Sequence, residues 1–232
     1  MIQIRKSEER GQANWGWLKA RHSFSFGEYH DPNHMGFREL RVMNEDLIEP
    51  GRGFGTHSHR DMEIVTYVYE GMILHKDSMG NQSVLREGEI QRMSAGWGIE
   101  HSEYNGSVVE PLRLLQIWIQ PDQKGVKPGY EQRAIPDEER QDQLSLIVSP
   151  DGREHSLKIH QDISIYSAIL MTAREVRHSL SPDRHAWVQL VKGGLSLNGN
   201  RLLAGDGAAV SQEKSLHFVA QEASEFLLFD LN

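Results

Sequence analysis

Two short stretches of the chain carry side chains that can hold a metal ion. His57 and His59 are separated by one residue, and so are His101 and Glu103. Because successive side chains of a β-strand point to opposite faces, residues i and i+2 share a face and lie roughly 7 Å apart along it. On two neighbouring strands, three imidazoles and one carboxylate can converge on a single ion. This donor set suits a first-row transition metal better than magnesium or calcium.

The alternative is that such pairs arise by chance on solvated strands, since the chain contains 12 histidines. Both pairs, however, follow glycines: Gly51, Gly53 and Gly55 precede the first, and Gly96 and Gly98 precede the second. Two pairs in the same kind of context, about forty residues apart, favour a shared metal site over chance.

Other polar and aromatic residues near these pairs are weaker candidates. Glu63 is either a hydrogen-bond partner of a ligand imidazole or a solvated charge. Trp97 either lines the mouth of a pocket or packs in the core, and Asn105 is expected to brace its loop. Eight further histidines are interpreted as structural or surface residues and not as ligands: His22, His30, His34, His155, His160, His178, His185 and His217.

Composition narrows the range of functions. The formal net charge of −8 disfavours direct binding to nucleic-acid phosphates. The absence of cysteine excludes disulfides and thiolate ligands. The first residues become charged at once and no long apolar run follows, so we expect no secretory signal, no membrane span and a cytoplasmic location.

Short strands must position the candidate ligands. Residues 64–69 and 112–119 are rich in β-branched and large apolar side chains, and glycine-containing turns separate the strand-like segments from 51 to 120. Strands that recur every eight to twelve residues or so, with no helical run between them, predict an all-β fold of the sandwich or barrel type.

A polar, turn-rich connector at residues 121–143 predicts two domains, 1–130 and 131–232, with few short helices. The second domain repeats the first, because 188–193 mirrors 66–71 and Gly205-Asp206 mirrors Gly88-Glu89.

The repeat also predicts where the second domain differs from the first. Counted from the shared turns, the four metal-competent positions are occupied by Ser179, Ser181, Phe218 and Ala220. We therefore expect a degenerate C-terminal domain without a metal site, and one metal ion per chain.

The chain contains two motifs that are similar to those of the cupin superfamily, Gly51-x5-His57-x-His59-x3-Glu63 and His101-x3-Asn105. The segments 22–26, 36–44 and 93–103 resemble the pirin family more closely. Glu63 lies one residue early for the general cupin motif, and Ser94-Ala95-Gly96 replaces its Pro-x-Gly. Both departures follow the pirin pattern.

The resemblance implies a bicupin with one mononuclear metal site, whose ligands would be His57, His59, His101 and Glu103. Fe(II) is the expected ion, with Mn, Ni, Co, Cu or Zn as alternatives. Bacterial pirins include quercetin 2,3-dioxygenases, so we expect flavonol cleavage by O2 with release of carbon monoxide, and Glu103 as the base. The animal member implies an alternative, a non-enzymatic regulator with a protein partner. An isomerase or storage-type cupin is a third option.

Overall fold

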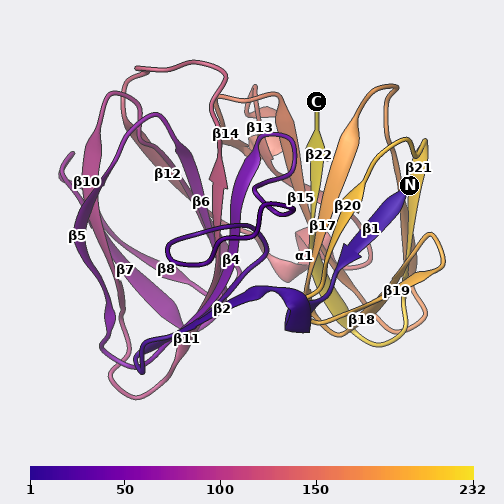
Figure 1. The fold of residues 1–232 in the computed structure, drawn as a ribbon, viewed down its shortest axis with the longest axis horizontal. Helices are drawn as coiled ribbons and strands as arrows, with labels where there is room; N and C mark the ends of the chain where they lie inside the picture. The colour runs from indigo at the N-terminus through magenta and orange to yellow at the C-terminus, as the bar shows by residue number, and fades with distance from the viewer. The chain divides into compact units, whose positions relative to one another are not determined.

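The computed structural model describes residues 1–232 and divides into two compact units. The N-terminal unit contains Gly11–Ala134 and Leu157–Gln161, and the C-terminal unit contains Met1–Arg10, Ile135–Ser156 and Asp162–Asn232. Both are built from antiparallel strands, so the predicted all-β fold is confirmed (Figure 1). None of the helices is long and apolar enough to cross a membrane.

The N-terminal unit contains two sheets. The larger has the order β12-β9-β6-β11-β4-β3-β2 and the smaller has the order β5-β10-β7-β8. Their strands are β2 (Gly11–Asn14), β3 (Leu18–His22), β4 (Leu40–Ile48), β5 (Gly53–His59), β6 (Glu63–Glu70), β7 (Met72–Asp77), β8 (Gln82–Arg86), β9 (Glu89–Ser94), β10 (Ile99–Asn105), β11 (Leu112–Ile119) and β12 (Gly129–Ala134). The unit also contains the two-residue strand β14 (Leu157–Lys158), which is part of neither sheet.

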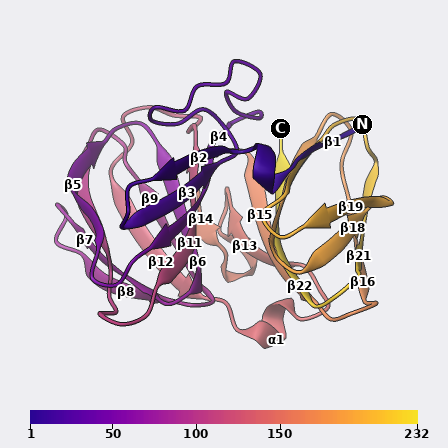
Figure 2. The ribbon, with the colours of Figure 1, turned by 60° about the horizontal axis from the view of Figure 1, so that its bottom comes forward.

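These two sheets face each other as a sandwich (Figure 2). At one end their inner faces share an apolar core, in which Ile48 and Val68 of the larger sheet pack with Ile73 and Leu85 of the smaller. Alternation of side chains along each strand explains why one face is apolar. Burial of this face is the main force that holds the sheets together.

The C-terminal unit repeats this plan. Its larger sheet contains the order β1-β20-β17-β22-β15-β13 and its smaller sheet has the order β16-β21-β18-β19. The strands are β1 (Ile2–Arg5), β13 (Ser145–Ser149), β15 (Ile163–Leu170), β16 (Glu175–Ser179), β17 (His185–Lys192), β18 (Gly194–Leu197), β19 (Asn200–Leu203), β20 (Gly207–Val210), β21 (Ser215–Ala220) and β22 (Ser224–Leu231), and the helical turns are η1 (Ser7–Glu9), α1 (Asp137–Arg140) and η2 (Arg153–His155).

The strand orders confirm the internal repeat. The run β9-β6-β11-β4-β3 of the N-terminal unit corresponds to β20-β17-β22-β15-β13, and β5-β10-β7-β8 corresponds to β16-β21-β18-β19. The echo between the turns after β6 and β17 therefore reflects two copies of one architecture.

The division into units does not follow the single cut between 1–130 and 131–232. Met1–Arg10 belongs to the C-terminal unit, where β1 pairs with β20 and Ile4 lies opposite Ala208. In the N-terminal unit, β12 covers the equivalent edge of β9. An uncovered edge strand leaves a row of unpaired backbone groups, so each copy needs a covering strand. The C-terminal copy takes its covering strand from the start of the chain.

Strand register also corrects one detail of the predicted repeat. Glu103 lies opposite His75, the fourth residue after its turn glycine, and the residue at the same place in the C-terminal unit is Leu197. Leu197 lies opposite Phe218. Phe218, and not Ala220, therefore occupies the Glu103 position. It is fully buried in an apolar core and offers no ligand atom.

Candidate metal centre

Three of the predicted site residues meet where β5 and β10 lie side by side. His57 is opposite His101, and His59 is opposite Ile99. The centroid of the His101 ring lies 4.4 Å from that of His57 and 4.9 Å from that of His59. One ring nitrogen from each histidine lies within 4.8 Å of the others. The i, i+2 spacing therefore does bring three imidazoles to one place.

Close approach of β5 to β10 depends on Gly53. A Cβ atom at this position would lie 2.2 Å from the backbone oxygen of Glu103 and 2.4 Å from the Cα atom of Tyr104. The register shifts by one residue between His101 and Glu103, so that Glu103 is opposite Phe54. Such a β-bulge re-aims side chains, and here it lies between two of the predicted ligands.

The imidazole of His57 is held in one orientation. Its Nδ1 lies 2.8 Å from the backbone oxygen of Gly55. A carbonyl can only accept, so Nδ1 carries the proton and donates it, and the lone pair is left on Nε2. Metal-binding histidines commonly have this second hydrogen bond, which fixes the ligand atom.

The other two imidazoles are kept neutral. Burial, followed by the neighbouring rings of His101 and His57, lowers the pKa of His59 to about 4. Burial, followed by His57 and His75, lowers the pKa of His101 to about 3. Near pH 7 protons therefore do not compete for these nitrogens, and their lone pairs are available to a metal.

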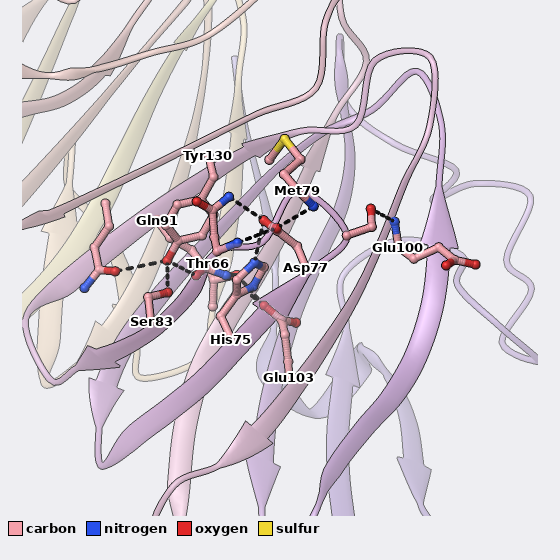
Figure 3. A network of polar contacts seen from close by, with 12 residues as sticks. Thr66, His75, Asp77, Met79, Ser83, Gln91, Glu100, Glu103 and Tyr130 are labelled. Atoms are coloured by element: carbon pink, nitrogen blue, oxygen red, sulfur yellow. Dashed lines mark hydrogen bonds and ion pairs between the residues drawn. The ribbon is translucent and has the colours of Figure 1, made fainter.

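Glu103 is almost completely buried, and neutral donors surround its carboxylate. Its Oε1 accepts a hydrogen bond of 2.8 Å from Gln91, and its Oε2 accepts one of 2.8 Å from Gln116. The Thr66 hydroxyl lies 3.4 Å from Oε1. Figure 3 shows Thr66 and Gln91 beside this carboxylate. The side chain is fixed in place although no cation pairs with it.

The donors to Glu103 belong to a row of polar side chains that crosses the larger sheet. Asn44 of β4 lies opposite Gln116 of β11, which lies opposite Thr66 of β6. Thr66 in turn lies opposite Gln91 of β9. We call these four residues the polar row. On the same face, the buried His22 of β3 lies opposite Asn44, and the buried Asp46 is two residues along β4.

His75 was assigned no role from the sequence, yet it lies beside the candidate ligands. Its side chain is buried against Tyr130, with ring centroids 4.7 Å apart. Nε2 of His75 lies 3.3 Å from the Asp77 carboxylate, and its Nδ1 has no hydrogen-bond partner (Figure 3). The signal that could have revealed it is the spacing of His75 and Asp77, which share one face of β7 by the same i, i+2 rule.

The four predicted ligands do not form one group of mutually close atoms. His57, His59 and His101 form one such group, whereas Glu103 groups with His101 and His75. His101 is common to both groups.

Asp77 is ionised, which fixes the tautomer of its neighbour. Although burial raises the pKa of Asp77, hydrogen bonds from Asn81, His75 and Met79 lower it overall. His75 therefore donates from Nε2 to this carboxylate, and its side chain belongs to the group that contains Glu103.

A cavity of about 930 Å³ opens beside the histidines. This lies within the usual range for small-molecule sites. Its polar lining includes His57, His59, Glu103 and Gln116. Its aromatic lining comprises Trp15, Trp17, Phe26, Tyr29, Phe54 and Trp118. A flat aromatic molecule could therefore lie against the metal-competent side chains.

The structure also decides between the interpretations of the three weaker candidates, Glu63, Trp97 and Asn105. Glu63 is fully buried, so the solvated interpretation is wrong. It accepts a hydrogen bond from Ser94 and lies 3.3 Å from Nδ1 of His160, and burial raises its pKa. Trp97 is 57% exposed, which excludes a core role, and it does not line the cavity. Asn105 does brace its loop, because its Nδ2 donates to the backbone oxygens of Ile48 and Glu110.

The arrangement implies a metal ion. Both ring nitrogens of His101 are buried and neither has a hydrogen-bond partner. Buried polar atoms are normally paired, since an unmet one costs about 1–3 kcal/mol. A transition metal on one nitrogen meets part of this need, and neutral imidazoles beside a carboxylate are the donors that such ions prefer.

Two sandwiches in tandem, with a histidine-rich metal centre in the first, define a bicupin. The chain belongs to the pirin family: the family model described as Pirin matches residues 3–119, and the model described as Quercetinase C-terminal cupin domain matches residues 146–231. The resemblance seen in the sequence is thereby confirmed.

Individual relatives agree with this assignment. A protein of Escherichia coli (strain K12) named "Quercetin 2,3-dioxygenase" is 50% identical over 231 residues, which covers 100% of this chain and 99% of the relative. A "Pirin-like protein" of Caulobacter vibrioides is 39% identical over 99% of both chains. The crystal structure of the bacterial pirin YhhW from Escherichia coli in complex with nickel(II) matches with a TM-score of 0.95 at 50% identity, and the match covers 100% of this chain and 99% of that one.

Proposed function

We propose that this protein is a mononuclear-metal dioxygenase that cleaves a flavonol with O2. The observation that carries the proposal is the position of the three-histidine cluster and Glu103 beside a cavity with aromatic walls. The name of the Escherichia coli relative supports the substrate class, because that relative is similar over the whole chain.

His57, His59, His101 and Glu103 would hold the ion. Bound there, the ion would supply Lewis-acid activation of a substrate oxygen and a site for O2. Fe(II) is the proposed ion, with Mn, Ni, Co, Cu and Zn as the alternatives. The nickel(II) complex of YhhW supports the ability of this architecture to hold a divalent transition metal.

Glu103 is the proposed base for the 3-hydroxyl proton of the flavonol. Glu103 lines the cavity, and as a carboxylate it can accept a proton. The hydrogen bonds from Gln91 to Oε1 and from Gln116 to Oε2 would keep the carboxylate in place beside the substrate. Both atoms of O2 would enter the depside product, and the carbon that bore the hydroxyl would leave with its own oxygen as carbon monoxide.

An oxygen-electrode assay with quercetin tests the proposal. Protein loaded separately with Fe(II), Mn, Ni, Co, Cu or Zn should consume one O2 and release one carbon monoxide per flavonol with at least one of these ions. His101→Ala should abolish uptake, because the shared member of both ligand groups is lost.

His217→Ala is the matched control, since it removes a histidine that is bonded to Glu175 in the C-terminal unit. It should leave uptake unchanged. If no ion supports uptake, the dioxygenase assignment fails, and a regulator that docks on a protein partner through its metal-bearing surface becomes the better account.

A further inference from the structure

Asn44 is the one member of the polar row that has no contact with Glu103. The side chains of Gln116, Thr66 and Gln91 form hydrogen bonds with that carboxylate or with one another. Asn44 instead lines the cavity. Its side chain is 2% exposed, and its Oδ1 has no hydrogen-bond partner. A buried acceptor without a partner is unusual in a folded protein and points to a missing donor.

Trp118 presents the complementary atom. It lines the same cavity, and its Nε1 is a buried donor without a partner. The indole is fixed between two rings, because its centroid lies 5.4 Å from that of Phe26 and 4.9 Å from that of His59. The contact with His59 places this indole ring next to the histidine cluster.

The two atoms belong to neighbouring positions on one face of the sheet. Asn44 lies opposite Gln116, and Trp118 is the next residue of β11 on the same face. Diagonal neighbours of this kind are roughly 7–8 Å apart, so one small group between them can reach both side chains. A hydroxyl can donate to Oδ1 of Asn44 while it accepts from Nε1 of Trp118.

The C-terminal unit shows that these polar atoms are not required by the fold. The residues at the places of the polar row are Tyr166, Leu228, Val188 and Ala208, which lie opposite one another in the same register. The same architecture is therefore stable with an apolar or aromatic row, and the asparagine at position 44 calls for another explanation.

We infer that Asn44 and Trp118 form a hydroxyl-binding subsite that orients the aromatic substrate beside the metal centre. The inference rests on the proposed function, because it assigns the ligand of the subsite as one phenolic hydroxyl of the flavonol. Both residues are binding residues that set orientation and selectivity.

The test measures binding without turnover. Nickel(II)-loaded protein is titrated under nitrogen with quercetin and with flavonols that each lack one hydroxyl. Wild-type protein should bind one of these analogues roughly 10-fold more weakly than quercetin. That analogue lacks the hydroxyl that pairs with Asn44 and Trp118, so both side chains stay without a partner. Asn44→Leu and Trp118→Phe should each bind that analogue and quercetin with nearly equal affinity. The double variant should add little, since both groups bind the same hydroxyl.

Asn14→Leu is the matched control. Asn14 lines the same cavity, but its Oδ1 already accepts a hydrogen bond of 3.0 Å from the backbone of Gly16. This variant should keep the 10-fold selectivity. Trp118→Phe keeps an aromatic ring, so it remains informative if Asn44→Leu fails to fold.

Two outcomes overturn the inference and are distinguishable. If the variants weaken all flavonols by one common factor, water or packing satisfies the two atoms, and the subsite is wrong while flavonol binding stands. If wild-type protein binds no flavonol, the proposed function fails and the subsite falls with it.

Discussion

Glu103 shows how a single carboxylate is held inside an apolar sandwich. Its oxygens are bonded to Gln91 and Gln116, and no arginine or lysine neutralises it. Neutral donors hold the side chain in place and leave its charge available to the proposed metal ion. Such supporting residues typically change metal affinity 10- to 100-fold or so when they are replaced.

Gln91→Leu should therefore weaken metal binding by roughly 10-fold or more, because it removes the 2.8 Å donor to Oε1 and leaves that oxygen only the 3.4 Å contact with the Thr66 hydroxyl. Competition with a chromogenic chelator measures the affinity. Gln132→Leu is the control, since Gln132 lies opposite Gln91 on β12 but its hydrogen bonds go to Val84, Glu89 and Tyr130 and none goes to Glu103. An equal loss in both variants would contradict the role of Gln91.

A second carboxylate, Asp230 of the C-terminal unit, carries a pH dependence. Although burial raises its pKa, hydrogen bonds from His178 and Arg184 lower the pKa of Asp230 overall below the ordinary value of 3.8. The unfolded chain therefore holds this proton more tightly. The ionised carboxylate stabilises the fold fully above about pH 4, and this contribution is lost as the pH falls below that value.

Asp230→Asn should lower the free energy of unfolding at pH 7 by about 1–3 kcal/mol, since His178 and Arg184 both lose the carboxylate that they contact. The gap between variant and wild type should narrow as the pH falls below 4 or so. Urea titrations at several pH values measure both effects. Asp162→Asn, which removes the exposed partner of Arg184, should have little effect, and a gap that stays constant with pH would refute the assignment.

At the scale of elements, the site depends on how closely β5 packs on β10. Gly53 permits this approach because its hydrogen faces the backbone of Glu103 and Tyr104. Backbone atoms cannot move aside as a flexible side chain would, so a methyl group there must push the two strands apart. The strands that separate are the ones that carry the four proposed ligands.

Gly53→Ala should thus lower stability by about 1–3 kcal/mol and weaken metal binding. Thermal unfolding and chelator competition measure these effects. Gly55→Ala is the matched control on the same strand, because its nearest atom would be the Tyr104 hydroxyl at an ordinary 3.7 Å. If the two variants behave alike, the close approach at Gly53 does not hold the site together.

Three features could be predicted from the sequence: the strands, the repeat and the meeting of His57, His59 and His101. They depend on alternation and i, i+2 spacing, which act within one strand. Other features depend on pairing between distant strands. The polar row takes one residue from each of four strands, and no local pattern marks it. His75 reaches the site only because β7 lies beside β10.

At the scale of the whole molecule, the N-terminal segment belongs to the C-terminal unit. Ile4 packs against its apolar core, whereas Gln3 faces solvent on the same strand. Composition gives no sign of this exchange, since any short strand could cover the edge of β20. The stability of the C-terminal unit thus depends on residues from the other end of the chain.

Ile4→Asn should destabilise the C-terminal unit by about 1–3 kcal/mol, because it places an amide against an apolar core. Gln3→Asn should be nearly neutral. Metal affinity should be unchanged in both variants, since the candidate centre lies in the N-terminal unit. Urea unfolding and chelator competition separate the two readouts, and a loss of metal affinity in Ile4→Asn would contradict this division.

The two copies of the sandwich also give the polar row an internal reference. Where one copy places Gln116 and Thr66, the other places Leu228 and Val188 in the same register. One polypeptide thus contains the same sheet architecture twice, once with a polar row and once with an apolar or aromatic one. Replacing Gln116 and Thr66 by leucine and valine, the residues at the same places in the C-terminal unit, would measure how the polar row changes the free energy of unfolding.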